Sequence, residues 1–216
     1  MPYLITYALI AITVLVSWRA FENPGLRAAL VHYPHREAHH GEYYRLLTHG
    51  FVHADWMHLG VNMFVLFFFG SFVEGEICGY GTINKYSFGP TVGPLIYLGL
   101  YLFTIVLASV STLIDHRDDP GYSALGASGA VSGATTLYAV FLPWHMIYIY
   151  ALIPIPAVIV AVLFILYSQY ADKRGGDNIG HAAHLWGAIT MPALYFLLRP
   201  GLIGHFVRQL TQNFPL

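Results

Sequence analysis

Six long apolar stretches dominate this 216-residue chain and constrain its fold more than any other feature. They cover roughly Tyr3–Arg19, Trp56–Val73, Val92–Ile114, Tyr122–Pro143, Met146–Tyr170 and Ile179–Leu198. Most reach the about 20 residues that a helix needs to cross the hydrocarbon core of a bilayer, and the first two are marginal. The stretches are continuous rather than alternating, which favours a helical bundle over a membrane β-barrel. We therefore expect an all-α, polytopic membrane protein with six transmembrane helices.

The six stretches use most of the chain, so we expect a single membrane domain over residues 1–216, with 199–216 as a short interfacial or cytoplasmic tail. The formal net charge of -1 offers no basic field for nucleic acid, so no nucleic-acid partner is expected. The one cysteine, Cys78, excludes an internal disulfide. The first stretch begins without a basic region, which favours a retained helix over a cleaved signal peptide.

Polar side chains fall at matching positions in the second, fourth and sixth stretches. These stretches run in the same direction if all six cross the bilayer. His58 and Asn62, Ser128, and His184 each lie within about two turns of the N-terminal end of their stretch, with Ser123 as a candidate cap of the fourth. At 1.5 Å rise per residue, all lie about 5–12 Å below one surface. Polar groups in hydrocarbon are costly, so we expect them to face the bundle interior or water.

These groups are the set that acyl transfer needs. A serine hydroxyl such as that of Ser128 is a weak nucleophile until a base takes its proton, and His184 titrates near neutral pH. His58, Asn62 and the Ser128 backbone N–H are candidate donors to a tetrahedral oxyanion. The apolar stretches carry no Asp or Glu near this depth, so a Ser–His dyad is expected rather than a triad.

Each candidate has a rival. Ser132 lies one helical turn after Ser128 on the same face, but deeper and farther from water. His181 competes with His184 but lies nearer the loop. The small residues around Ser128 also suit simple helix packing, because glycines spaced along a membrane helix permit close approach. We prefer Ser128 and His184 because three separate segments bring polar groups to one depth.

The long connection Phe21–Asp55 is rich in aromatic residues and histidines, and predicts a folded element at the membrane interface with a short helix over Glu42–His49. Its histidines raise a metal-binding alternative, because imidazole pairs at i, i+4 suit zinc. No HExxH motif or nearby carboxylate base accompanies them, so we expect hydrogen-bonding interfacial histidines, no metal and no cofactor. The residues in question are His35, His39, His40, His49, His53 and His58.

On these motifs the chain resembles the rhomboid intramembrane serine proteases along nearly its whole length. The matching residues are Gly126-Ala127-Ser128-Gly129, His58-x-x-x-Asn62 and Ala183-His184-x-x-Gly187, with Thr48-His49, His53, Arg45 and Glu74. The resemblance implies a rhomboid-like bundle that hydrolyses peptide bonds in or near transmembrane segments of membrane-protein substrates. By the same resemblance, Ser128 is the nucleophile, His184 the general base, and His58, Asn62 and the Ser128 amide the oxyanion site.

Two positions depart from the family pattern. Some relatives have a tyrosine four residues after the serine, packed against the catalytic histidine, where this chain has Ser132; this could alter the orientation of His184. Met191 stands where a glycine is expected, which predicts looser packing of the sixth helix. Two other function classes remain: a His-rich metal-dependent membrane hydrolase or transporter, and a catalytically silent rhomboid-like chaperone, against which the intact Ser128 and His184 argue.

Two features of the sequence disagree about the orientation of the chain in the membrane. Lys and Arg are more frequent in the loops that follow the first, third and fifth stretches, so the positive-inside rule puts the candidate site on the cytoplasmic side. The resemblance implies an inner cell membrane with the site opening to the extracytoplasmic side, and we follow it. We also expect Pro154 and Pro156 to kink the fifth helix beside a lateral opening, with the Asp172–Asp177 loop capping the site.

Overall fold

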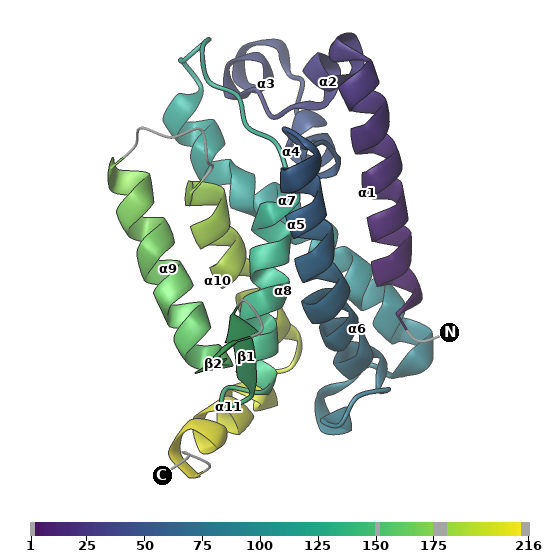
Figure 1. The fold of residues 1–216 in the computed structure, drawn as a ribbon, viewed down its shortest axis with the longest axis vertical. Helices are drawn as coiled ribbons and strands as arrows, with labels where there is room; N and C mark the ends of the chain where they lie inside the picture. The colour runs from purple at the N-terminus through teal and green to yellow at the C-terminus, as the bar shows by residue number, and fades with distance from the viewer. Residues whose placement is uncertain (1–2, 150–151, 175–180, 213–216) are drawn as a thin grey trace.

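The computed structural model describes residues 3–149, 152–174 and 181–212, and over these residues the chain is mostly helical with a two-stranded antiparallel hairpin (Figure 1). The elements in chain order are α1 (Leu4–Glu22), α2 (Pro24–Leu30), α3 (Pro34–His40), α4 (Arg45–Thr48), the 3₁₀ turn η1 (His49–Phe51), α5 (Trp56–Val65), the π-helical η2 (Leu66–Gly70), α6 (Ser71–Cys78), the 3₁₀ turn η3 (Asn84–Tyr86), α7 (Gly89–His116), α8 (Ser128–Phe141), β1 (Met146–Ile149), β2 (Ile153–Pro156), α9 (Ala157–Arg174), α10 (His181–Leu198) and α11 (Gly201–Gln212).

Helix α8 is the centre of the bundle. It contacts α5, α6, α7, α9, α10 and α11, and twelve of its fourteen residues are buried. A helix that is apolar and small on every side, as α8 is, has no face to give to solvent and packs in the interior. In Figure 1, α5, α8 and α10 all begin toward the end of the bundle where α2 and α3 lie. The common direction expected for these three helices is therefore present.

Three helical segments have the length and apolar character to cross a membrane: α1, the continuous run Trp56–Cys78, and α7. Helices α10 and α11 meet at 117° and together form a candidate fourth span, within the residues described. The chain is thus an integral membrane protein of helical type. With fourteen residues, α8 is about 21 Å long, which is less than the about 30 Å of hydrocarbon. The six-span count stays a prediction.

Glu74 fastens α6 to the start of α1. Its carboxylate accepts hydrogen bonds from the backbone N–H of Ile5 at 2.9 Å and of Thr6 at 2.8 Å, and from the Thr6 hydroxyl at 2.6 Å. The first N–H groups of a helix have no partner within it, and a negative charge there also favours the helix dipole. Glu74 therefore caps the start of another helix.

The connection between α1 and α5 is folded, as expected, and Arg45 organises it. The buried guanidinium donates to the carbonyl oxygens of Ala28 at 2.8 Å and Val31 at 3.0 Å, and its Nε lies 2.6 Å from Glu42. The helix expected over Glu42–His49 is present as the shorter α4, followed by η1. The location of this connection at a membrane surface stays a prediction.

The segment Met146–Tyr170 is not one kinked helix, and this expectation is wrong. Its first part is the β1–β2 hairpin, in which Tyr148 pairs with Pro154 and Met146 with Pro156, and α9 begins only at Ala157. Proline cannot donate to a helical ladder, whereas it is tolerated in an edge strand and just before a helix. The two prolines therefore separate a hairpin from α9 instead of bending a helix. Of the Asp172–Asp177 loop expected to cap the site, residues 172–174 belong to α9 and residues 175–177 lie outside the described residues.

Candidate active site

Ser128 and His184 meet at the starts of α8 and α10. Ser128 is the first residue of α8, and does not lie five residues inside a helix capped by Ser123 as the sequence suggested. Gly126 has φ = 119°, a conformation that only glycine adopts readily, and it turns the chain into α8 two residues later. His184 is in the first turn of α10, and its Nε2 lies 2.7 Å from Ser128 Oγ. This distance is that of a hydrogen bond.

Glycines allow the two helices to approach this closely. A Cβ atom on Gly187 would overlap the carbonyl oxygen of Gly129 and lie 2.8 Å from its Cα, so neither backbone leaves room for a side chain. One turn deeper, a Cβ on Gly133 would lie 2.8 Å from the Cβ of Met191, which is fully buried. Met191 thus fills the space that Gly133 leaves. The looser packing expected from Met191 is not seen where α8 and α10 cross.

The loop that leads into Ser128 is held by the histidine-rich connection. Ala124 pairs with His32 through two backbone hydrogen bonds of 2.9 and 3.0 Å, in an isolated antiparallel bridge. The pattern continues at Gly126, whose N–H donates to the His49 carbonyl at 2.9 Å, and at Ala127, whose N–H donates to His53 Nε2 at 3.3 Å. The backbone just before Ser128 is therefore held on one side at three of the four residues 124–127.

His53 is a supporting residue whose partners the sequence did not reveal. Its ring is completely buried, and it links the Ala127 N–H to Ser17 on α1, whose Oγ is 3.0 Å from His53 Nδ1 and donates to the Phe51 carbonyl. A backbone N–H can only donate, so His53 Nε2 is unprotonated and Nδ1 carries the hydrogen. The spacing of the histidines marked His53 as notable, but Ser17 is 36 residues away along the chain.

His49 and His53 are buried inside the protein. His49 Nε2 lies 2.8 Å from Ser109 Oγ of α7, so His49 ties the connection to a second helix. Burial lowers the pKa of both imidazoles to about 3, with the neighbouring histidines adding to the effect. Desolvation disfavours the charged form, so both rings are neutral near pH 7. The hydrogen bonding expected of these histidines is present, and their position at the membrane interface stays a prediction.

His58 and Asn62 lie on α5 beside the same loop. Asp55 caps α5 by accepting from the His58 N–H at 2.8 Å, which puts His58 in the first turn. A Cβ on Gly126 would lie 2.8 Å from His58 Cε1 and 3.0 Å from Nε2, so the ring packs against the loop two residues before Ser128. The Ala54 N–H faces His58 Nδ1 at 3.4 Å, which favours a hydrogen on Nε2, toward the loop. Asn62 is buried and donates to the His58 carbonyl at 2.9 Å.

The two rivals have other contacts. The Ser132 hydroxyl donates to the Ser128 carbonyl at 2.7 Å, a bond within α8. His181 is buried at the first position of α10, where its ring meets the edge of His184 at 5.9 Å between centroids. The aromatic ring that some relatives place beside this histidine from the position of Ser132 comes here from another helix. Phe164 of α9 lies nearly parallel to the His184 imidazole, with 6.0 Å between the ring centroids.

The six histidines of the metal-binding alternative lie in two separate groups. His49, His53 and His58 lie beside the loop that precedes Ser128, whereas His35, His39 and His40 lie on α3, where His39 Nε2 is 3.0 Å from Asp118. Among the described residues, no three His, Cys, Asp or Glu side chains converge in a way that could hold a metal ion. This arrangement does not support the metal-dependent alternative.

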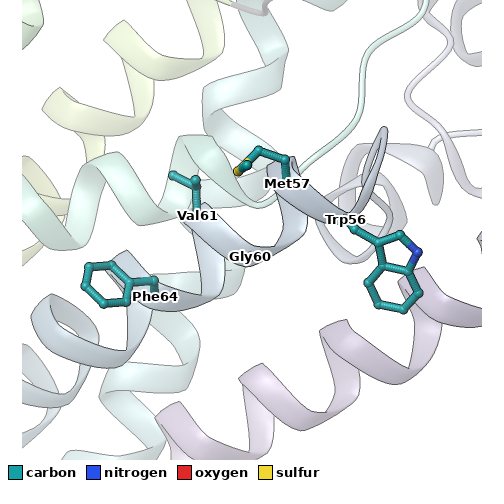
Figure 2. Close-up of a pocket in the computed structure, with 5 residues that line it drawn as sticks. All are labelled: Trp56, Met57, Gly60, Val61 and Phe64. Carbon is teal, nitrogen blue, oxygen red and sulfur yellow. The ribbon is translucent and has the colours of Figure 1, made fainter.

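An apolar depression of about 570 Å³ lies on the outer face of α5 (Figure 2). It is lined by Trp56, Met57, Gly60, Val61 and Phe64, and the close-up shows Met57, Val61 and Phe64 on one side of the helix, with Trp56 turned toward another. The opposite face of α5 carries Leu59, Asn62 and Met63, which are buried. The depression thus belongs to the side of α5 that faces away from Asn62 and includes none of the four candidate residues.

The chain is similar to a known protein family and to two curated proteins. A family model described as the Rhomboid domain matches residues 40–201. The chain is 28% identical to RHOMBOID-like protein 12, mitochondrial, of Arabidopsis thaliana over 161 residues, which is 74% of this chain and 48% of that protein. It is 30% identical to Rhomboid-like protein 11, chloroplastic, of the same organism over 165 residues, which is 72% of this chain and 52% of that protein. The chain spans about half the length of the curated relatives it matches.

Proposed function

Because the chain belongs to the rhomboid family, we propose that it is an intramembrane serine endopeptidase that cuts membrane-protein substrates in or near their transmembrane segments. Ser128 is the nucleophile and His184 the general base of a Ser–His dyad. The observation that supports this most is the 2.7 Å separation between His184 Nε2 and Ser128 Oγ. The two residues are 56 positions apart in the chain, and each lies at the start of a helix.

In the first half of the reaction, Ser128 Oγ attacks the carbonyl carbon of the scissile peptide bond while its proton passes to His184 Nε2. The tetrahedral intermediate collapses when the C–N bond breaks, and His184 gives that proton to the leaving amine. Water then attacks the acyl-serine ester, His184 takes a proton from the water, and the carboxylic product leaves with Ser128 restored. The dyad needs no cofactor, since each proton that His184 accepts is returned within the cycle.

The oxyanion of each tetrahedral intermediate needs donors in a site with little water. The Ser128 N–H is at the N-terminal end of α8, where N–H groups have no partner within the helix and the dipole favours negative charge. His58 lies against the loop before Ser128 with Nε2 on the near side, and Asn62 Nδ2 keeps a second hydrogen beyond the one given to the His58 carbonyl. We assign the oxyanion site to these three donors.

The partners we propose are the lipid bilayer and the transmembrane segment of a substrate protein. The short α8 supports a reaction centre below the membrane surface, because a helix about 9 Å shorter than the hydrocarbon core starts inside it when its far end reaches the opposite surface. Helices α8 and α10, which carry Ser128 and His184 in their first turns, begin toward the end of the bundle where α2 and α3 lie (Figure 1). The names of the relatives refer to a mitochondrion and a chloroplast, so the comparisons do not support the expected inner cell membrane.

The test is cleavage of a fluorogenic transmembrane reporter by purified protein in liposomes. Ser128→Ala and His184→Gln are expected to reduce turnover to background, and the matched control Ser132→Ala is expected to stay within a few-fold of the parent protein because that hydroxyl only bonds the backbone of its own helix. Asn62→Ala is expected to lower kcat by about 10²–10³ if it donates to the oxyanion. Retained turnover in Ser128→Ala would refute the assignment.

Labelling with a fluorophosphonate separates the protease from the silent chaperone. A fluorophosphonate phosphonylates a serine only when a base activates it, so we expect labelling of the parent protein at Ser128 and none in His184→Gln. A properly folded parent protein that neither cleaves nor labels would favour the chaperone class. Stoichiometric zinc in the purified protein, with loss of cleavage on chelation, would favour the metal-dependent class.

A further inference from the structure

The imidazole of His184 is contacted by an aromatic ring from α9. The centroids of the Phe164 and His184 rings are 6.0 Å apart and the ring planes differ by 29°, which is an offset, nearly parallel arrangement. One turn after Ser128, α8 itself carries the small Ser132, whose hydroxyl is bonded to the Ser128 carbonyl. The ring beside the imidazole therefore belongs to a different helix from the serine that the imidazole binds.

The contact is part of a repeating match between α9 and α10. Phe164 and Tyr167 are three residues apart on α9, and His181 and His184 are three residues apart on α10, so each pair lies on one face of its helix. Tyr167 meets His181 edge to face at 5.8 Å, and the two histidines meet at 5.9 Å. The match fixes which α9 residue faces which α10 residue, and it leaves Phe164 opposite the candidate base.

A histidine ring turns about two side-chain bonds, and the second has a broad energy profile. The hydrogen bond from Nε2 to Ser128 holds the ring at one atom, and a contact on the ring face limits its remaining rotation. Phe164 supplies such a contact. We propose that Phe164 is a positioning residue that holds the His184 ring with Nε2 toward Ser128 Oγ through the packing of α9 against α10. This proposal rests on the proposed function.

Three substitutions test the ring itself. Phe164→Leu keeps an apolar side chain of similar bulk but removes the aromatic face, Phe164→Tyr restores the face, and Tyr167→Leu makes the same ring-to-leucine change one turn along α9, opposite His181. In reporter cleavage, Phe164→Leu is expected to lower kcat about tenfold with KM unchanged, since loss of an aromatic pair corresponds to roughly one factor of ten in rate. Phe164→Tyr and Tyr167→Leu are expected to stay near the parent value.

A second readout does not depend on cleavage. In protein labelled with 15N-histidine, the chemical shift of His184 Nε2, assigned by its loss in His184→Gln, reports whether this nitrogen accepts the Ser128 hydrogen bond. We expect the accepting shift in the parent, Phe164→Tyr and Tyr167→Leu proteins, and its loss in Phe164→Leu without a change in melting temperature. An unchanged shift in Phe164→Leu, or an equal loss in Tyr167→Leu, would overturn the proposal. If no protein cleaves the reporter, the proposed function fails, while the nitrogen shift still decides the role of Phe164.

Discussion

The contact between Gly187 and Gly129 gives the sharpest test of the site geometry. Gly187 lies one turn after His184 on α10, and Gly129 directly follows Ser128 on α8. In Gly187→Ala the new methyl group would overlap the Gly129 carbonyl oxygen and lie 2.8 Å from Gly129 Cα. Both obstacles are backbone atoms of a buried helix, so they cannot turn aside as a flexible side chain would. Alanine fits only if α8 and α10 separate.

The required separation can be worked from the structure. Carbon atoms in contact lie about 3.5–4.0 Å apart, so a pair at 2.8 Å must move apart by about 1 Å. The same movement would stretch the Ser128–His184 contact from 2.7 Å to about 3.7 Å, beyond hydrogen-bond range. A misplacement of about 1 Å costs on the order of 10²-fold in rate, and overpacking costs about 1–3 kcal/mol of stability.

The assay is reporter cleavage in liposomes, with fluorophosphonate labelling and thermal unfolding in detergent measured on the same samples. The matched control is Gly99→Ala on α7, where the added methyl group meets nothing within 4 Å and where helix propensity favours alanine by about 1 kcal/mol. We expect Gly187→Ala to lose about 10²-fold in kcat and in labelling rate, and Gly99→Ala to match the parent protein. Parent-like rates and melting temperature in Gly187→Ala would refute the close crossing of α8 and α10.

Two further predictions concern stability. Burial lowers the pKa of His49 and His53 from about 6.5 to about 3, so the unfolded chain binds more protons than the folded chain between these pH values. The free energy of unfolding is therefore highest above about pH 6.5. It falls by up to about 1.4 kcal/mol per pH unit for each histidine as the pH drops toward 3. The melting temperature should therefore fall between pH 7.5 and pH 5, less steeply in His53→Gln, and an equal slope in the two proteins would contradict the assigned cause. Glu74→Gln removes the carboxylate that accepts hydrogen bonds from the N–H groups of Ile5 and Thr6, and should lower the free energy of unfolding in denaturant by about 1–3 kcal/mol. Fluorophosphonate labelling of the folded fraction should persist. An unchanged free energy of unfolding would argue against the cap.

The residues beside the candidate site could be foreseen from the sequence because hydrocarbon restricts where polar side chains go. His58, Asn62, Ser128 and His184 are polar residues in apolar stretches, and a buried polar group in a membrane needs a partner or water. The helical class follows from the same restriction, since backbone groups in lipid must be bonded within each segment. Helix period and direction then predicted that these side chains share one end of the bundle, as the structure shows for α5, α8 and α10.

Local features that depend on distant partners were predicted less well. The stretch Met146–Tyr170 is apolar enough for one helix, but a hairpin pairs Met146 with Pro156 and leaves α9 to begin at Ala157. Helix α8 begins at Ser128 and not at the expected Ser123, because the residues before Ser128 form hydrogen bonds with His32, His49 and His53 instead of within the helix. Apolar composition indicates how favourable it is to transfer a segment into lipid, and it does not distinguish one long helix from a hairpin followed by a helix.

The sequence by itself determined that this is a helical membrane protein with a serine, two histidines and an asparagine near three helix starts, because hydropathy and helix period are local properties. Only the tertiary structure decided that Ser128 and His184 lie within a hydrogen bond, that His53 supports the loop before the serine, and that Phe164 stacks on the imidazole. Each of these contacts joins segments from different helices. They depend on how closely two backbones approach, and that distance is set by packing, as at Gly129 and Gly187.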